Sequence, residues 1–158
     1  TRRPPVRVSG GGDAPIDFGL VGDVTGFDLD LIDLALRGGY VPVVACLGSG
    51  PGGEVFNINA DIVSNQLAVA LAADPLVLVT SAPGVLRDIK DPSSRLGRLT
   101  VEEGRRAIAD GTVQGGMIPK LEESFAALAA GARRIVITDG DVARAVREPG
   151  SVGTTLSA

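Results

Sequence analysis

The sequence contains no histidine, no tryptophan and a single cysteine, and these absences exclude several kinds of site. One cysteine cannot form a disulfide framework. Without histidine the chain has no Cys/His zinc site and no Ser-His-Asp or Cys-His catalytic triad. The five aromatic residues are scattered and offer no platform on which bases could stack. The apolar runs stay below the roughly 18 residues that a membrane-spanning helix needs.

Basic residues are also few, and nearly all of them are arginine. The chain has 15 Lys+Arg against 19 Asp+Glu, and the resulting net charge of −4 argues against nucleic acid as a partner. Only Lys90 and Lys120 are lysines. No signal or targeting segment is recognisable, which predicts a cytoplasmic protein without a membrane partner.

Apolar segments of strand length alternate with helical patterns along the chain. Strands are predicted at residues 18–24, 40–47, 54–58, 76–79, 135–137 and 152–156. Helices are predicted at residues 28–37, 60–73, 100–111, 117–130 and 142–146. The run at 40–47 (YVPVVACL) is typical of a strand buried on both faces of a parallel sheet, and the GGGD segment at 10–13 predicts a hairpin tip. The alternation predicts an α/β fold, a three-layer αβα sandwich with a mostly parallel sheet.

Two segments that follow predicted strands are candidates for a ligand site, because ligands of open α/β sheets bind at such positions. In residues 57–61 (NINAD), a cap by Asn59 and a first-turn position for Asp61 would explain two polar side chains, but Asn57 has no evident structural role. A binding role and a capping role therefore both stay open. Residues 80–86 (TSAPGVL) either let a ligand approach the backbone closely or form a plain tight loop.

The third candidate is residues 111–120 (GTVQGGMIPK), where paired glycines precede a predicted helix. The first N–H groups of such a helix can bind an anion, and Lys120, one turn later, can add a compact positive charge. Since the chain uses arginine almost everywhere else, a lysine here favours a need for an ammonium group. Lys90 is predicted to be a solvated surface residue. Together the three segments predict a site for a phosphorylated ligand.

These motifs resemble, in order and spacing, those of the amino acid kinase family, and the resemblance covers nearly all of residues 17–158. GGMIPK at 115–120 is its most specific part. The resemblance implies transfer of a phosphoryl group from ATP, with Mg²⁺, to the side-chain carboxylate of N-acetyl-L-glutamate in arginine biosynthesis. It further implies that residues 1–61 end an N-terminal lobe for the amino acid substrate and that residues 62–158 form a nucleotide-binding lobe.

The resemblance also implies roles for single residues. Lys120 would stabilise the transferring phosphoryl group, Asp61 would orient Lys120, and Asn57 and Asn59 would bind the substrate. The nucleotide pocket would be lined by Thr80, Ser81, Gly84, Gly116 and Met117. A carboxylate nucleophile is already ionised at neutral pH, so this reaction needs no general base, and no metal site made by the protein alone is expected.

Two departures from the family pattern bear on these expectations. Ser81 stands where relatives commonly carry aspartate, and the family's first glycine-rich turn with its own lysine has no counterpart. The fold is therefore expected to be incomplete at its N-terminus, with no useful turnover by this chain alone, and the full-length protein is expected to be at least a dimer. Two alternatives remain: an arginine-sensing kinase-like domain of an acetylglutamate synthase, or another amino acid kinase that forms an acyl phosphate. The presence of both Asp61 and Lys120 argues against the sensor.

Overall fold

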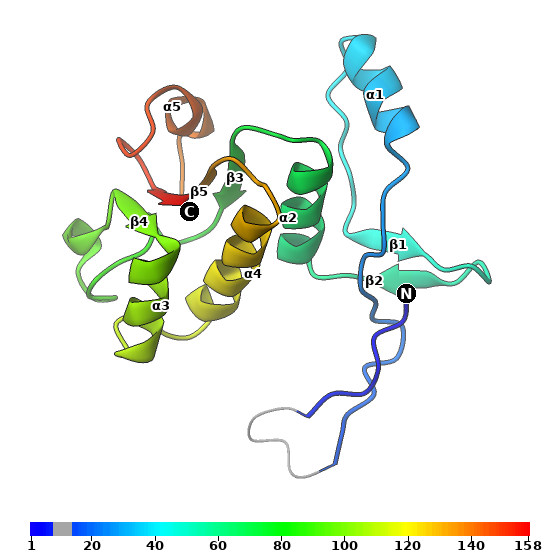
Figure 1. Cartoon of the computed structure of the whole chain (residues 1–158), viewed down its shortest axis with the longest axis horizontal. Helices are drawn as coiled ribbons and strands as arrows, with labels where there is room; N and C mark the ends of the chain where they lie inside the picture. The colour runs from blue at the N-terminus through cyan, green and yellow to red at the C-terminus, as the bar shows by residue number, and fades with distance from the viewer. Residues whose placement is uncertain (8–13) are drawn as a thin grey trace. The chain divides into compact units, whose positions relative to one another are not determined.

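The computed structural model describes residues 1–7 and 14–158, so the hairpin tip predicted at 10–13 lies outside the described residues. The chain divides into two compact units, Thr1–Val63 (unit 1) and Ser64–Ala158 (unit 2). Figure 1 labels most of the helices and strands of both units. Within the described ranges, no helix is long and apolar enough to cross a membrane.

Unit 1 contains a short antiparallel hairpin and one helix. Strand β1 (Leu47–Ser49) pairs with β2 (Val55–Asn57). Helix α1 (Leu29–Arg37) begins after Asp28, whose side chain accepts a hydrogen bond from the backbone N–H of Asp30. The helix predicted at 28–37 is therefore confirmed. The small buried core of the unit consists of Phe56, Ile58 and Val63.

The prediction of a buried strand at residues 40–47 is wrong. Only Leu47 belongs to a strand, and the side chains of Tyr40 and Val43 are 72% and 96% exposed. An apolar run becomes a buried strand only when neighbouring strands pair with its backbone and other elements cover its faces. No described residue forms a ladder with residues 40–45.

The strand predicted at 18–24 is also wrong, because this segment forms only two isolated bridges. Val21 pairs with Asn57, and Gly22 pairs with Arg2. Gly19 has a φ of 71°, which interrupts the extended backbone that a longer strand requires.

Unit 2 is built on a four-stranded sheet in the order β3-β5-β6-β4. Its strands are β3 (Leu76–Val79), β4 (Arg98–Thr100), β5 (Ile135–Thr138) and β6 (Thr154–Ser157). The β3–β5 and β4–β6 pairs are parallel, whereas β5 and β6 are antiparallel. All four residues of β5 are buried, so the sheet is covered on both faces. The predicted α/β fold with a mostly parallel sheet is confirmed; β4, with three residues, was too short to give a periodic signal.

Helices cover the two faces of this sheet. On one face α3 (Val101–Ala109) and α4 (Met117–Ala129) contribute to the main apolar core, and on the other α5 (Val142–Arg147) contacts β3 and β5. Figure 1 shows α5 on the side of the sheet away from α3 and α4. Helix α2 (Ala60–Ala70) lies at the boundary between the units along the chain, and a short 3₁₀ turn, η1 (Pro92–Ser94), precedes β4.

The start of α3 shows why local sequence predicts these helices well. The Thr100 hydroxyl accepts a hydrogen bond from the backbone N–H of Glu103 at 3.2 Å, and the Glu103 carboxylate accepts one from the backbone N–H of Thr100 at 2.9 Å. This reciprocal pair is a capping box, and its Thr-x-x-Glu spacing is present in the sequence at residues 100–103. The backbone N–H of Thr100 is the main reason that the pKa of Glu103 lies below its ordinary value.

Candidate functional site

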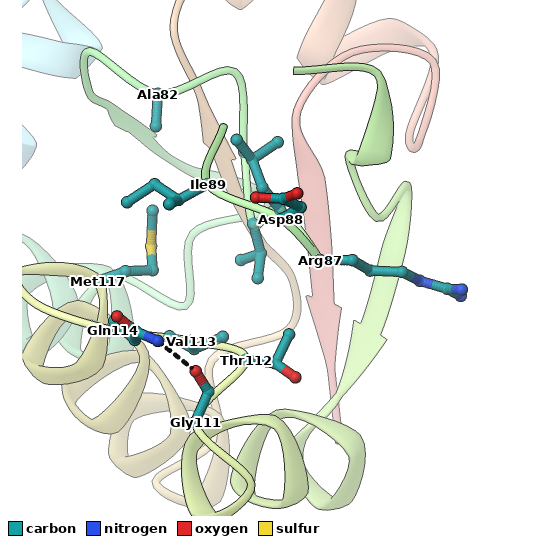
Figure 2. Close-up of a pocket in the computed structure, with 12 residues that line it drawn as sticks. Ala82, Arg87, Asp88, Ile89, Gly111, Thr112, Val113, Gln114 and Met117 are labelled. Atoms are coloured by element: carbon teal, nitrogen blue, oxygen red, sulfur yellow. Dashed lines mark hydrogen bonds between the residues drawn. The ribbon is translucent and has the colours of Figure 1, made fainter. Parts of the chain in front are cut away.

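A cavity of about 360 Å³ in unit 2 joins two of the candidate segments. It is lined by residues 84–89 of the loop after β3 and by residues 111–114 between α3 and α4, together with Ala82 and Met117. Figure 2 shows these residues around the cavity. The volume lies within the range of small-ligand sites, about 300–1,000 Å³. The lining is largely apolar with a few polar groups, as such sites usually are.

Gly84, in the loop after β3, is buried and fits closely against the start of β6. A Cβ at this position would lie 2.5 Å from the Thr154 hydroxyl, and its φ of 143° is one that other residues rarely adopt. That hydroxyl accepts a hydrogen bond from the N–H of Val85 at 2.8 Å and donates one to the carbonyl of Leu96 at 2.6 Å. The fold therefore requires glycine here, whether or not a ligand approaches it.

The second wall of the cavity is a hydrogen-bonded turn after α3. The Asp110 carboxylate accepts a hydrogen bond from the backbone N–H of Thr112 at 2.9 Å, which lowers the pKa of Asp110. The side-chain amide of Gln114 donates to the carbonyl of Gly111 at 2.7 Å, as Figure 2 shows. These bonds hold the turn in place while Val113 packs into the core with 4% of its surface exposed.

The paired glycines lie at the start of α4, where Gly116 is the N-cap and makes no side-chain cap hydrogen bond. A Cβ on Gly116 would meet no atom within 4 Å, so the surface above this residue is open. Lys120 is half-buried one turn into the helix. An exposed helix start with a lysine close behind it is suited to an anion such as a phosphate group.

The structure separates the five residues predicted for the nucleotide pocket. Gly84 and Met117 line the cavity, whereas Thr80, Ser81 and Gly116 do not. The backbone N–H of Thr80 donates to the carbonyl of Thr138 at 2.8 Å and so extends the β3–β5 pairing. The residues at 87–89 also line the cavity but were not predicted, since no glycine or periodic pattern marks them.

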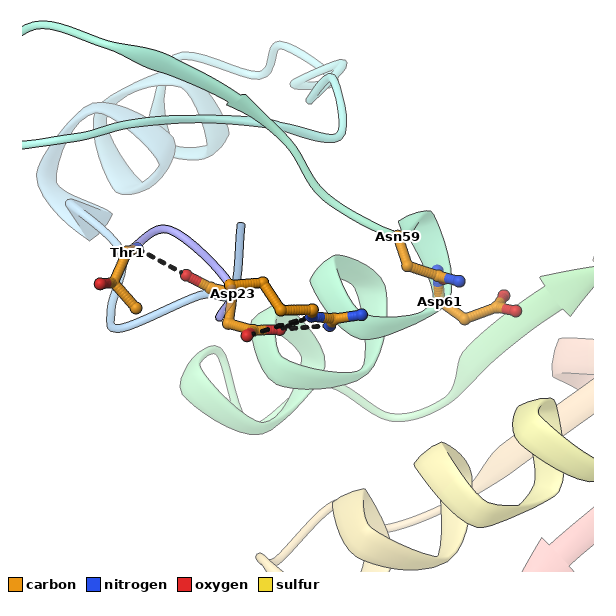
Figure 3. A network of polar contacts seen from close by, with 5 residues as sticks. Thr1, Asp23, Asn59 and Asp61 are labelled. Carbon is orange, nitrogen blue, oxygen red and sulfur yellow. Dashed lines mark hydrogen bonds and ion pairs between the residues drawn. The ribbon is translucent and has the colours of Figure 1, made fainter. Parts of the chain in front are cut away.

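The predicted substrate residues lie in unit 1: Asn57 ends β2, and Asn59 stands just before α2. The backbone N–H of Asn57 donates to the carbonyl of Leu20 at 2.8 Å, and the residue is exposed. The Asn59 side chain accepts a hydrogen bond from the backbone N–H of Asp61 at 2.8 Å, so the capping role considered for Asn59 is confirmed. Figure 3 shows Asn59 and Asp61 at the start of the helix.

Unit 1 also contains an ion pair that the sequence does not predict. The Arg3 guanidinium donates from Nε to both carboxylate oxygens of Asp23, at 3.0 and 3.2 Å, and this lowers the pKa of Asp23. The N-terminal ammonium of Thr1 donates to the Asp23 carbonyl at 2.8 Å, as Figure 3 shows. Arg3 and Asp23 are 20 positions apart in the sequence, so no local pattern predicts this ion pair.

Fold and cavity together define an α/β protein with a cavity of small-ligand size beside a glycine-rich helix start. The sequence matches the amino acid kinase family over residues 4–139, and the chain belongs to that family. An acetylglutamate kinase of Anaeromyxobacter dehalogenans (strain 2CP-C) is 59% identical, over 99% of this chain and 59% of that protein. An acetylglutamate kinase of Sorangium cellulosum (strain So ce56) is 57% identical, over 98% of this chain and 56% of that protein. The chain thus spans less than two thirds of the length of these curated relatives.

Among solved structures, smu.665 from Streptococcus mutans UA159 matches 89% of this chain and 52% of its own, with 34% identity and a TM-score of 0.74. N-acetylglutamate synthase from Neisseria gonorrhoeae, complexed with coenzyme A and L-arginine, matches 98% of this chain and 35% of its own. That match has a TM-score of 0.79 at 23% identity, which shows a shared fold alone.

Proposed function

We propose that this chain is part of an acetylglutamate kinase, an enzyme that uses ATP to phosphorylate the side-chain carboxylate of N-acetyl-L-glutamate in arginine biosynthesis. The identity of 59% to an acetylglutamate kinase over nearly all of these residues carries the proposal. The cavity beside the GGMIPK segment supports it. The activity is proposed for the full-length protein that contains these residues, which is called the encoded polypeptide below.

In this proposal unit 2 binds the nucleotide. The apolar lining of the cavity suits a nucleobase, and the open helix start at Gly116 suits the phosphates. The residues proposed to contact the nucleotide are Thr80, Ser81, Gly84, Gly116 and Met117. The lobe division at 61/62 that the family resemblance implies is likewise a proposal, with the amino acid substrate bound by Asn57 and Asn59.

The proposed chemistry demands charge neutralisation more than proton transfer. A carboxylate oxygen of the substrate attacks the γ-phosphorus of ATP, the bond from that phosphorus to the β,γ-bridging oxygen breaks, and ADP leaves. The carboxylate is ionised at neutral pH, so no proton has to be removed. Lys120 would stabilise the negative charge on the transferring group, and Asp61 would orient Lys120.

Mg²⁺ is proposed to enter with ATP as part of the substrate. The described residues contain no group of three or more His, Cys, Asp or Glu side chains that could hold a metal ion by themselves. A magnesium ion that enters with a nucleotide binds mainly to phosphate oxygens and keeps several waters. We also propose, from composition and the lack of a recognisable targeting segment, a cytoplasmic protein that binds neither nucleic acid nor membranes. From the family resemblance we propose a homo-oligomer of at least two subunits.

Hydroxylamine trapping of the acyl phosphate tests the substrate. The encoded polypeptide is incubated with MgATP, hydroxylamine and one acid at a time: N-acetyl-L-glutamate, L-glutamate, L-aspartate or an aminoadipate derivative. We expect hydroxamate from N-acetyl-L-glutamate alone. Hydroxamate from another acid would mean that this acid, and not N-acetyl-L-glutamate, is the substrate. No hydroxamate with any acid, together with binding of L-arginine, would contradict the kinase and support the arginine sensor.

A further inference from the structure

A large apolar side chain is held in solvent at the edge of the cavity. Ile89 lines the cavity, yet 74% of its surface is exposed, the highest fraction among the exposed large apolar residues of unit 2. Val79 and Val142 are exposed too, at 61% and 44%, but they do not line the cavity. Single exposed apolar residues are common on proteins, so the position of Ile89 beside an apolar cavity is what distinguishes it.

The backbone on both sides of Ile89 is fixed by hydrogen bonds. The N–H of Asp88 donates to the Ser94 hydroxyl at 3.0 Å, and that hydroxyl lies 3.1 Å from the Asp88 carbonyl. The N–H of Lys90 donates to the Asp88 carboxylate at 2.9 Å, and the N–H of Asp91 donates to the Asp88 carbonyl at 3.0 Å. Ile89 is thus presented on a preorganised turn, so contact with a ligand would cost little loop entropy.

The side chains around Ile89 define what kind of ligand surface it fits. Figure 2 shows Ile89 on the same side of the cavity as Ala82 and Met117, while the Arg87 guanidinium points away from them. Ala82, Ile89 and Met117 are apolar, so together they suit a flat apolar group rather than a phosphate.

We infer that Ile89 packs against the base of a nucleotide bound in this cavity and contributes directly to nucleotide affinity. The inference rests on the proposed nucleotide site of unit 2. The contact is one of dispersion and apolar burial, so it depends on the size of the side chain at position 89 and not on hydrogen bonding. Because Ile89 is mostly exposed without ligand, its removal should leave the stability of the unliganded protein unchanged.

The test measures the dissociation constant of MgATP by calorimetry for the encoded polypeptide and three variants. Ile89→Ala removes three carbon atoms from the contact and should weaken binding about tenfold. Ile89→Leu keeps the apolar volume and should stay within about twofold of the unsubstituted protein. Val142→Ala trims an exposed aliphatic side chain of α5, outside the cavity, and is the matched control.

The results separate this inference from the function on which it rests. If the unsubstituted protein does not bind MgATP, the proposed nucleotide site itself is wrong. If it binds MgATP but Ile89→Ala binds as tightly as Val142→Ala, the nucleotide site stands and the role of Ile89 is wrong. A clear drop in the melting temperature of unliganded Ile89→Ala would also overturn the inference, because it would make the residue structural.

Discussion

The substitution Gly84→Ala should destabilise unit 2 strongly, because the structure leaves no room for a side chain at this position. The added Cβ would lie 2.5 Å from the Thr154 hydroxyl and 3.0 Å from the Thr154 backbone nitrogen. Moving Thr154 would break the buried hydrogen bonds of its hydroxyl with Val85 and Leu96. An unfavourable backbone conformation costs about 1–3 kcal/mol. A buried polar group without its partner costs about 1–3 kcal/mol more. The expected total is therefore about 2–6 kcal/mol.

Urea unfolding followed by far-ultraviolet circular dichroism measures this loss, with Gly116→Ala as the control. Gly116 has a φ of −65°, and a Cβ there would meet nothing within 4 Å. Its substitution should change the free energy of unfolding by less than about 1 kcal/mol. The same variant should weaken MgATP binding if phosphates approach the start of α4, so it separates a ligand role from a structural one.

The reasoning would be refuted if Gly84→Ala lost less than about 1 kcal/mol of stability. It would also be refuted if Gly116→Ala proved as unstable as Gly84→Ala. Both glycines belong to segments that the sequence marked as candidate sites, so this pair tests directly whether the structure separates their roles.

Three further substitutions test other parts of the structure. Ala72→Gly should stabilise the protein by about 1 kcal/mol in urea unfolding, because Ala72 has a φ of 48° after the end of α2. Gly104→Ala should destabilise it by about 1–3 kcal/mol, since the new Cβ would lie 2.3 Å from the buried ring of Phe125. Arg3→Gln should raise the pKa of Asp23, measured by NMR titration of its carboxyl carbon. In the unsubstituted protein this pKa lies below 3.8, so the ion pair contributes stability above about pH 4 and loses it as the pH falls through the lowered pKa.

Each of these has an outcome that would contradict it. A destabilising Ala72→Gly would mean that the left-handed conformation is not strained. An unchanged urea-unfolding midpoint for Gly104→Ala would mean that α3 and α4 separate easily. If Arg3→Gln left the pKa of Asp23 unchanged, the guanidinium would not be what lowers it.

Local signals predicted the helices and the central strands of unit 2. Thr100 and Glu103 predict the start of α3 because a capping box is formed within four consecutive residues. Residues 76–79 and 135–137 are apolar runs that do find partners, since β3 and β5 pair in parallel along their whole length. Secondary structure is predicted correctly where the stabilising contacts are close in sequence, as in a helix cap, or where an apolar run finds a pairing strand.

The failures have the opposite cause. The run at 40–47 has the composition of a buried strand, but composition does not say whether a pairing strand is available, and Val43 is almost fully exposed. Ile89 lies at the cavity on a loop whose Asp88 N–H donates to the Ser94 hydroxyl, and Arg3 contacts Asp23 across 20 positions. These outcomes depend on contacts between segments, which no local pattern contains.

The central claim, phosphoryl transfer to N-acetyl-L-glutamate assisted by Lys120, is tested most directly by comparing the chain's two lysines. The rate of hydroxamate formation from MgATP and N-acetyl-L-glutamate is measured for the encoded polypeptide and for its Lys120→Ala and Lys90→Ala variants. Lys120→Ala should lower kcat by about 100- to 1,000-fold, as expected for loss of a group that stabilises transition-state charge. Lys90, exposed in the loop before η1, should be replaceable without loss of rate. Equal rates for the two variants, or no hydroxamate from the unsubstituted protein, would contradict the account.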